Sequence, residues 1–140
     1  MYKIVPAVNV LIVKNNRVLF TRRQNKSWGN GKLVLPGGHV EKDETPTNAI
    51  IREVYEELGV SVNKDHLKFL CTALRYRTQE KTVAQIFTIN KDYNYTNNEP
   101  NQCSELVWSS ILKLPKDVID DYKIIIKEAY INNKKYLEII

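Results

Sequence analysis

The sequence predicts an α/β fold in which a mixed β-sheet lies between helices, an α/β/α sandwich. Three observations indicate this fold. The chain opens with an apolar segment of strand character and a hairpin partner. Two segments of helical period follow at residues 46–58 and 117–132, and short strand-like segments lie between them. Strand and helix periodicity alone would also permit other α+β folds.

The first strands are expected near the N-terminus. Residues 5–13 are apolar enough for a central strand, Asn15 and Asn16 mark a turn, and residues 17–21 return as a second strand, so a hairpin is predicted. Residues 24–31 form a polar loop, and residues 32–36 form the next strand, which ends at a proline.

Later strands are predicted at residues 67–74, 82–89 and 105–109, separated by polar segments. Apolar residues of helical period then predict an amphipathic helix over 117–132. The last segment, 136–140, is apolar and packs either on this domain or on a second copy; the sequence does not decide between them.

The helix at 46–58 has the clearest end signals in the chain. Thr45 is a good N-cap, Pro46 suits the first helical position, and Gly59 can adopt the left-handed conformation that stops a helix. Ile50, Val54 and Leu58 recur every four residues and define the face turned toward the core.

Three acids, Glu53, Glu56 and Glu57, lie on a neighbouring strip of the same helix. Like charges at this spacing repel, and anions near a helix C-terminus oppose the macrodipole, so a cation is expected to offset them. Oxygen ligands suit Mg²⁺, or Mn²⁺ as a substitute. A solvated acidic face, with Arg52 paired to Glu56, is the plainer alternative for such a cluster alone.

The spacing from Gly38 to Val60 resembles the Nudix box, Gly-x5-Glu-x7-Arg-Glu-U-x-Glu-Glu-x-Gly-U with U aliphatic. The fixed positions are matched by Gly38, Glu44, Arg52, Glu53, Val54, Glu56, Glu57, Gly59 and Val60. The chain is therefore similar to Nudix hydrolases, which cleave a nucleoside diphosphate linked to another moiety with the help of a divalent metal. The resemblance also implies the Nudix-type sandwich of a mixed sheet between helices.

The same resemblance implies roles for the box residues. Glu53, Glu56 and Glu57 would bind the metal, with the carbonyl of Gly37 or Gly38 as a further ligand. Glu44 and Arg52 would form a buried pair that ties the loop to the helix. The general base is not fixed by the resemblance: Glu56 or Glu53 are the first candidates, followed by Glu99 or Glu105.

Phosphate contacts are expected from Arg22 or Arg23, of which at most one faces the site because adjacent strand residues point to opposite faces, and Arg23 is preferred. Arg75 and Arg77 could also meet phosphate, although solvated strand ends are the favoured interpretation for both. Possible base contacts complete the set: Tyr76, Trp28 and Phe87 by stacking, Phe87 being more typical of a core position, and Asp117 or Asp120 at a base edge.

The expected function is Mg²⁺-dependent hydrolysis of a nucleoside triphosphate, or a related diphosphate derivative, to a monophosphate and pyrophosphate. Removal of an oxidised guanine nucleotide is one specific version. The alternatives are a Nudix-like module that binds nucleotide or RNA without cleavage, or hydrolysis of an RNA cap.

Composition sets the remaining expectations. The 140 residues, 43% hydrophobic, suffice for one domain over residues 1–140. The net charge of +5 comes from scattered basic residues, so a nucleic-acid partner is not favoured. The start of the chain lacks the pattern of a signal peptide and no apolar run reaches membrane length, so a cytoplasmic protein without a membrane partner is expected. The family resemblance is compatible with a homodimer.

Overall fold

The computed structural model describes residues 3–76 and 80–140, and its strands form two sheets. The larger sheet has the order β5-β1-β7-β6-β9. Its strands are β1 (Lys3–Leu11), β5 (Gly37–His39), β6 (Leu67–Tyr76), β7 (Glu80–Ile89) and β9 (Tyr136–Ile139). β1 is parallel to β7 but antiparallel to β5, so this sheet is mixed, as predicted.

The smaller sheet is built around β3 (Arg17–Arg23). β3 pairs antiparallel with β2 (Val13–Lys14), β4 (Leu33–Val34) and β8 (Cys103–Ser110). The predicted hairpin is therefore present as β2 and β3. Asn15 and Asn16 both adopt positive φ, of 52° and 59°, which matches the twist of a tight two-residue hairpin turn.

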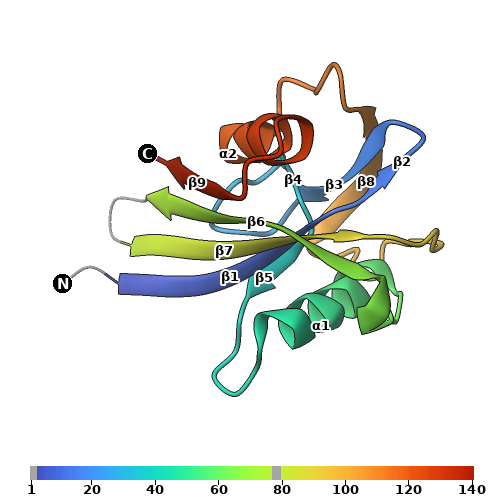
Figure 1. Ribbon diagram of the computed structural model, residues 1–140. Helices are drawn as coiled ribbons and strands as arrows, with labels where there is room; N and C mark the ends of the chain where they lie inside the picture. The colour runs from blue at the N-terminus through green and yellow to red at the C-terminus, as the bar shows by residue number, and fades with distance from the viewer. Residues whose placement is uncertain (1–2, 77–79) are drawn as a thin grey trace.

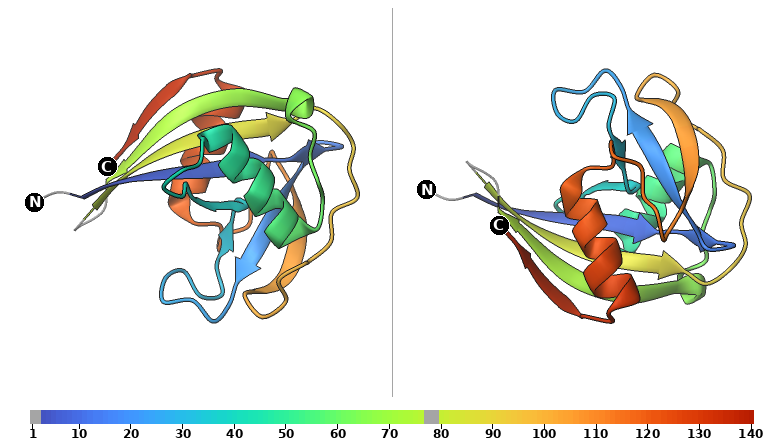
Figure 2. Two further views of the ribbon diagram at one scale, coloured as in Figure 1. Left: turned by 90° about the horizontal axis from the view of Figure 1, so that it is seen from below. Right: turned by 90° about the horizontal axis from the view of Figure 1, so that it is seen from above.

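Helices cover both faces of the larger sheet (Figures 1 and 2). α1 (Pro46–Leu58) lies on one face, and α2 (Asp120–Ile125), which continues as the π-helix η2 (Ile126–Ile131), lies on the other. A short 3-10 turn, η1 (Lys64–His66), leads into β6. The predicted α/β/α sandwich is confirmed. None of the helices in the described ranges is long and apolar enough to cross a membrane.

The apolar run at 5–13 is explained by burial on both faces of β1. Ala7 and Leu11 belong to the core cluster on the α2 side, whereas Val8 and Val10 belong to the cluster on the α1 side. A strand covered by helices on both faces needs a continuous apolar run rather than alternation. The two clusters hold α1 and α2 in fixed positions relative to the sheet between them.

α1 has the predicted ends. The Thr45 side chain accepts a hydrogen bond from the Asn48 backbone N–H at 3.2 Å, and Pro46 is the first helical residue. Gly59 ends the helix in the left-handed conformation, with φ of 70°, and its N–H donates to the Tyr55 carbonyl. Ile50, Val54 and Leu58 are fully buried, so the predicted core face is confirmed.

Other predicted boundaries need correction. The strand expected at 5–13 ends at Leu11, because the chain then changes sheets at Val13. Only Leu33–Val34 of the strand expected at 32–36 pairs with a neighbour, and β5 (Gly37–His39) was not predicted, because its glycines carry no strand signal. The last helix starts at Asp120 rather than 117, because Val118 forms a bridge with Leu33.

The C-terminal segment packs on its own domain. β9 runs parallel to β6, with Leu137 opposite Ala73 and Ile139 opposite Arg75. Leu137 and Ile139 are buried in the core cluster on the α2 side. Of the two alternatives for residues 136–140, packing on this domain or on a second copy, the buried side chains of Leu137 and Ile139 therefore show the first.

Candidate active site

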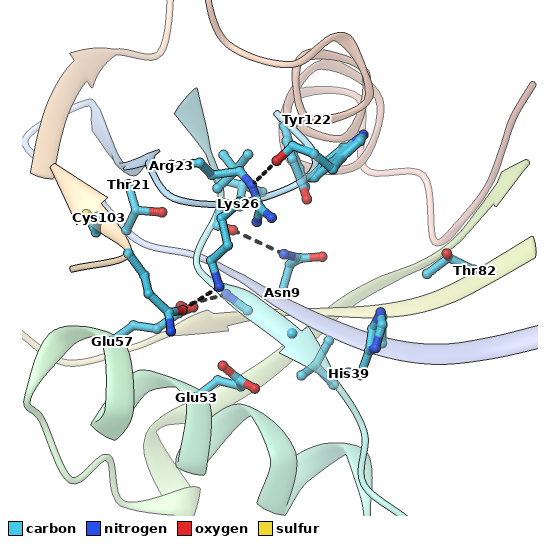
Figure 3. A pocket seen from close by; sticks show the side chains of 18 of the residues that line it. Asn9, Thr21, Arg23, Lys26, His39, Glu53, Glu57, Thr82, Cys103 and Tyr122 are labelled. Atoms are coloured by element: carbon cyan, nitrogen blue, oxygen red, sulfur yellow. Dashed lines mark hydrogen bonds between the residues drawn. The ribbon is translucent and has the colours of Figure 1, made fainter. Parts of the chain in front are cut away.

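A cavity of about 1170 Å³ opens at the end of α1 that carries the acidic residues. Figure 3 shows Glu53 and Glu57 reaching toward it from α1, and Arg23 and Tyr122 on the opposite side, with Asn9 of β1 between them. Hydrogen bonds from the Asn9 side chain to the Leu35 and Pro36 carbonyls tie β1 to the segment that enters β5. The cavity thus has an acidic wall and a wall rich in basic and aromatic groups.

Arg52 and Glu44 form the predicted ion pair, but both side chains are partly exposed, at 23% and 15%, rather than buried. Arg52 donates from Nε to Glu44 Oε2 at 2.8 Å and from Nη2 to Glu44 Oε1 at 2.9 Å. Arg52 Nη2 also donates to the His39 carbonyl at 3.0 Å, so the loop after β5 is fixed to α1. The Arg52 hydrogen bonds lower the pKa of Glu44 to about 2, and Glu44 in turn raises the pKa of Arg52.

Glu53 and Glu57 are held against β5. The Gly37 N–H donates to Glu57 Oε1 at 2.9 Å, and a Cβ at Gly38 would lie 2.4 Å from Glu53 Oε1. Only glycine at position 38 lets the Glu53 carboxylate take this place. Burial raises the pKa of Glu53 and raises the pKa of Glu57 well above its ordinary value. Two partly buried, neighbouring carboxyl groups are therefore costly to ionise together without a cation.

The third box acid, Glu56, is more exposed and shares Arg52 with Glu53. Arg52 Nη1 lies 2.8 Å from Glu53 Oε1 and 3.3 Å from Glu56 Oε2. As placed, the acidic, histidine and cysteine side chains of residues 3–76 and 80–140 form no group of three or more that could hold a metal ion. The donor set still fits a hard divalent cation, because it consists of carboxylate oxygens, two of them on partly buried side chains, on one cavity wall.

The two downstream acids are separated by the fold. Glu99 lines the cavity beside the α1 acids, and its pKa is raised by burial and by Glu56. Glu105 is exposed on β8 and accepts a hydrogen bond from Arg22 Nε at 2.7 Å. Only Glu99 of this pair is therefore placed to act on a molecule in the cavity.

Arg22 and Arg23 are also separated. Arg22 pairs with Glu105 and Asp117, and these contacts join β3, β8 and the segment before α2. Arg23 lines the cavity, donates from Nε to the Trp28 carbonyl at 2.8 Å, and lies with Cζ 4.7 Å from the Trp28 ring centroid. The structure therefore places Arg23 and not Arg22 in the cavity wall.

Comparison with known proteins agrees with this geometry. The NUDIX domain model matches residues 3–128. The chain belongs to the Nudix family.

Curated Nudix relatives match only part of the chain. An 8-oxo-dGTP diphosphatase of Escherichia coli is 39% identical over 61 residues, 44% of this chain and 47% of that protein. An RNA pyrophosphohydrolase of Psychromonas ingrahamii is 35% identical over 82 residues, 56% of this chain and 42% of that protein. The chain thus spans about half the length of the curated relatives it matches.

Solved Nudix structures share the whole fold. A MutT NUDIX hydrolase from Burkholderia pseudomallei superposes with a TM-score of 0.80 at 24% identity, over 89% of this chain and 97% of that chain. At this identity the likeness establishes the fold alone. It shows that the sandwich seen here, with the box helix on one face, is the Nudix arrangement.

The prediction for Arg75 was wrong. Arg75 is not at a solvated strand end: it is only 6% exposed, lines the cavity, and donates from Nε to Asp121 Oδ2 at 2.8 Å. The sequence around Arg75 does not predict this burial, because the residues that cover its side chain, Asp121 and Tyr122, belong to α2 and are distant along the chain. Arg77, also considered at the sequence level, lies outside the described residues.

The acids expected to read a base edge lie elsewhere. Asp117 pairs with Arg22, and Asp120 is exposed with Lys123 3.7 Å away, so neither lines the cavity. Of the aromatic candidates, Tyr76 and Trp28 line the cavity. Phe87 is buried in the core on the α1 side, as its strand pattern indicated.

Three further lining residues, Lys26, Asn9 and Tyr122, were missed at the sequence level. Asn9 had a usable signal, because it is a polar residue inside a strand of apolar neighbours. Lys26 lies in the polar loop between β3 and β4 and donates from Nζ to Gln102 Oε1, and nothing local distinguishes it from other exposed lysines. Tyr122 recurs with helical period among the apolar residues of its helix, so the sequence pattern indicates a core position and not a cavity wall.

Proposed function

We propose that this protein is a Mg²⁺-dependent hydrolase of a nucleoside triphosphate, or a related nucleoside diphosphate derivative, that releases a monophosphate and pyrophosphate. One observation carries the proposal: the box acids and Glu99 line one wall of a single cavity, and the cations Arg23 and Lys26 line it too. A polyphosphate in this cavity could bind a metal at the acidic wall and contact Arg23 on the opposite side, while the Lys26 amino group reaches toward Glu57 (Figure 3).

We assign the acidic wall to metal binding. Glu53, Glu56 and Glu57 would hold the ion, with the Gly38 carbonyl as a further ligand. Glu99 lines the same cavity and interacts electrostatically with Glu56, so its carboxylate adds to the negative charge around the ion. Arg52 and Glu44 do not touch the cavity's contents in this assignment; they fix the helix to the loop that carries Gly37 and Gly38. When bound, the divalent cation neutralises phosphate charge and lowers the pKa of water.

The protein's own groups account for the remaining steps. Arg23 contacts substrate phosphates, and Tyr76 stacks on the nucleoside. In hydrolysis a water oxygen bonds to phosphorus while the phosphoanhydride P–O bond breaks, and the water proton passes to a carboxylate. Glu56 is our first candidate for that base, because it is the most solvent-accessible of the three α1 acids, and Glu53 is the second.

The test is pyrophosphate and phosphate release from a panel that includes 8-oxo-dGTP, CTP, the common triphosphates, RNA with a 5′-triphosphate, nucleotide sugars and ADP-ribose. We expect pyrophosphate from at least one triphosphate with Mg²⁺ and none with a chelator. Glu56→Gln should abolish at least about 99% of the release. Glu138→Gln is the matched control, because Glu138 is exposed, accepts a hydrogen bond from the Tyr136 hydroxyl and does not line the cavity.

Nucleotide binding without turnover of any panel member in Mg²⁺ would contradict the proposal and favour a binding module. Release only from the RNA would move the substrate to a capped or triphosphorylated RNA end. A cytoplasmic location, a single domain over all 140 residues and a homodimer stay predictions, which cell fractionation, limited proteolysis and light scattering can test.

A further inference from the structure

The guanidinium of Arg75 has a donor that the fold leaves unused. Its Nε binds Asp121 and its Nη1 lies 3.4 Å from the Tyr122 hydroxyl, but Nη2 has no hydrogen-bond partner among the described residues. A buried N–H group without an acceptor costs free energy comparable to a lost hydrogen bond. A group that persists in this state next to a cavity is therefore a candidate for binding a ligand.

The position of Arg75 within the cavity indicates which part of a nucleotide it would meet. Its neighbour Tyr122 lies across the cavity from Glu53 and Glu57 (Figure 3). Phosphates are expected between the α1 acids and Arg23, and Tyr76, the cavity-lining residue next to Arg75 in β6, is assigned to the nucleoside; Arg75 is therefore expected at the nucleoside end. Arg75 already has an ionic partner in Asp121, and a neutral acceptor is therefore favoured over a second anion.

Two aromatic rings flank the guanidinium. Arg75 Cζ lies 4.9 Å from the Tyr122 ring centroid and 5.9 Å from that of Trp28. Flat rings beside a donor suit a flat, stacked ligand such as a nucleobase. Nη2 is buried in this conformation, so the inference requires that a covering side chain moves when a base binds. Trp28, which is 38% exposed in the loop between β3 and β4, is our candidate for that side chain.

We propose that Arg75 is a specificity-determining residue that donates from Nη2 to an exocyclic oxo group of the substrate's nucleobase. An oxo group accepts this hydrogen bond, whereas an amino group at the same ring position presents a donor and leaves Nη2 unpaired. The site therefore selects oxo bases over their amino counterparts. This inference rests on the proposed nucleotide hydrolysis.

The experiment compares two substrate pairs that differ at that position, ITP with ATP and dUTP with dCTP. In the native protein, kcat/KM should favour the oxo member of at least one pair by about tenfold or more. Arg75→Lys keeps the charge that pairs with Asp121, but lysine has a single nitrogen, so an ammonium held at Asp121 leaves no donor at the position of Nη2. In this variant the preference should fall below about twofold, mainly through the rate on the oxo member.

Arg17→Lys makes the same chemical change at an exposed arginine of β3 outside this cavity and should leave the preference unchanged. Thermal melting of both variants checks that they fold. A native protein without preference in either pair overturns the inference. So does an equal loss on both members of a pair in Arg75→Lys, because a purely structural role predicts that result.

Binding separates this inference from the proposed activity. Calorimetric titration of IMP and AMP, and of dUMP and dCMP, needs no turnover. Tighter binding of an oxo monophosphate to the native protein but not to Arg75→Lys supports the role of Arg75, even where no triphosphate is hydrolysed and the proposed function has failed. Equal or absent binding of oxo and amino members overturns the role of Arg75, whatever the turnover.

Discussion

Arg52 holds Glu44 through two parallel hydrogen bonds, from Nε at 2.8 Å and from Nη2 at 2.9 Å. The Glu44 carboxylate also accepts a hydrogen bond from the Glu41 N–H at 3.0 Å, while Arg52 donates to the His39 carbonyl. One planar guanidinium thus connects the start of the box loop, its middle and α1. Bidentate geometry of this kind is stronger and more specific than an exposed ion pair.

Breaking this pair should destabilise the protein. Arg52→Gln should lower the free energy of unfolding by about 1.5–3 kcal/mol, because charge-assisted hydrogen bonds are lost and Glu44 is left without its partner. Urea denaturation of the native protein, Arg52→Gln, Glu44→Gln and the double variant measures this. The double variant should lose clearly less than the sum of the single losses; strict additivity would show that the two side chains do not interact.

The same pair makes stability depend on acid. The pKa of Glu44 is lowered from its ordinary value of 4.5 to about 2 in the folded protein. The ionised carboxylate therefore stabilises the folded protein fully at pH values above about 4.5. That contribution should disappear as the pH falls from about 4.5 toward 2, because Glu44 then takes up a proton. Unfolding free energies of the native protein and Glu44→Gln should therefore converge over this range. A gap that stays constant down to pH 2 would contradict this origin.

Gly37 and Gly38 should respond differently to a methyl group. A Cβ at Gly38 meets the Glu53 carboxylate, at 2.4 Å, which is the mobile end of a side chain. Gly38→Ala should displace Glu53 and reduce activity at least about tenfold with little loss of stability. A Cβ at Gly37 meets the Val8 carbonyl of β1, at 2.1 Å, and φ there is +155°.

Gly37→Ala should therefore cost at least about 2 kcal/mol of stability, because neither the β1 backbone nor this φ can adjust cheaply. Thermal melting and turnover assays on both variants separate the two effects. Equal destabilisation by the two alanines would show that the Glu53 carboxylate is not what makes glycine necessary at position 38.

Glu99 and Glu105 offer a matched pair for testing the cavity. Glu99→Gln should reduce Mg²⁺-dependent turnover at least about tenfold, because it removes a carboxylate next to the α1 acids. Glu105→Gln should leave turnover within about twofold, because Glu105 is exposed and contacts Arg22 instead. Steady-state rates at several Mg²⁺ concentrations decide the matter. A larger loss in Glu105→Gln would mean that the cavity does not define the reacting region.

Local signals in the chain predicted α1 to the residue. Thr45, Pro46 and Gly59 act through backbone angles and hydrogen bonds that involve only near neighbours, so their effect survives any tertiary context. The same holds for the turn at Asn15 and Asn16 and for the spacing of the box acids. The family and the sandwich fold followed from this information, and the acids on α1 were placed on one strip by helix geometry alone.

Only the tertiary structure decided which side chains share the cavity. Arg22 and Arg23 are adjacent in sequence, yet one binds Asp117 and the other faces the cavity. Arg75 is buried by Asp121 and Tyr122, which lie more than forty positions away along the chain. Such environments depend on the pairing of distant strands and on the packing of α2, and no local pattern encodes them. The sequence by itself determined α1 and the spacing of its acids; the fold determined what faces them.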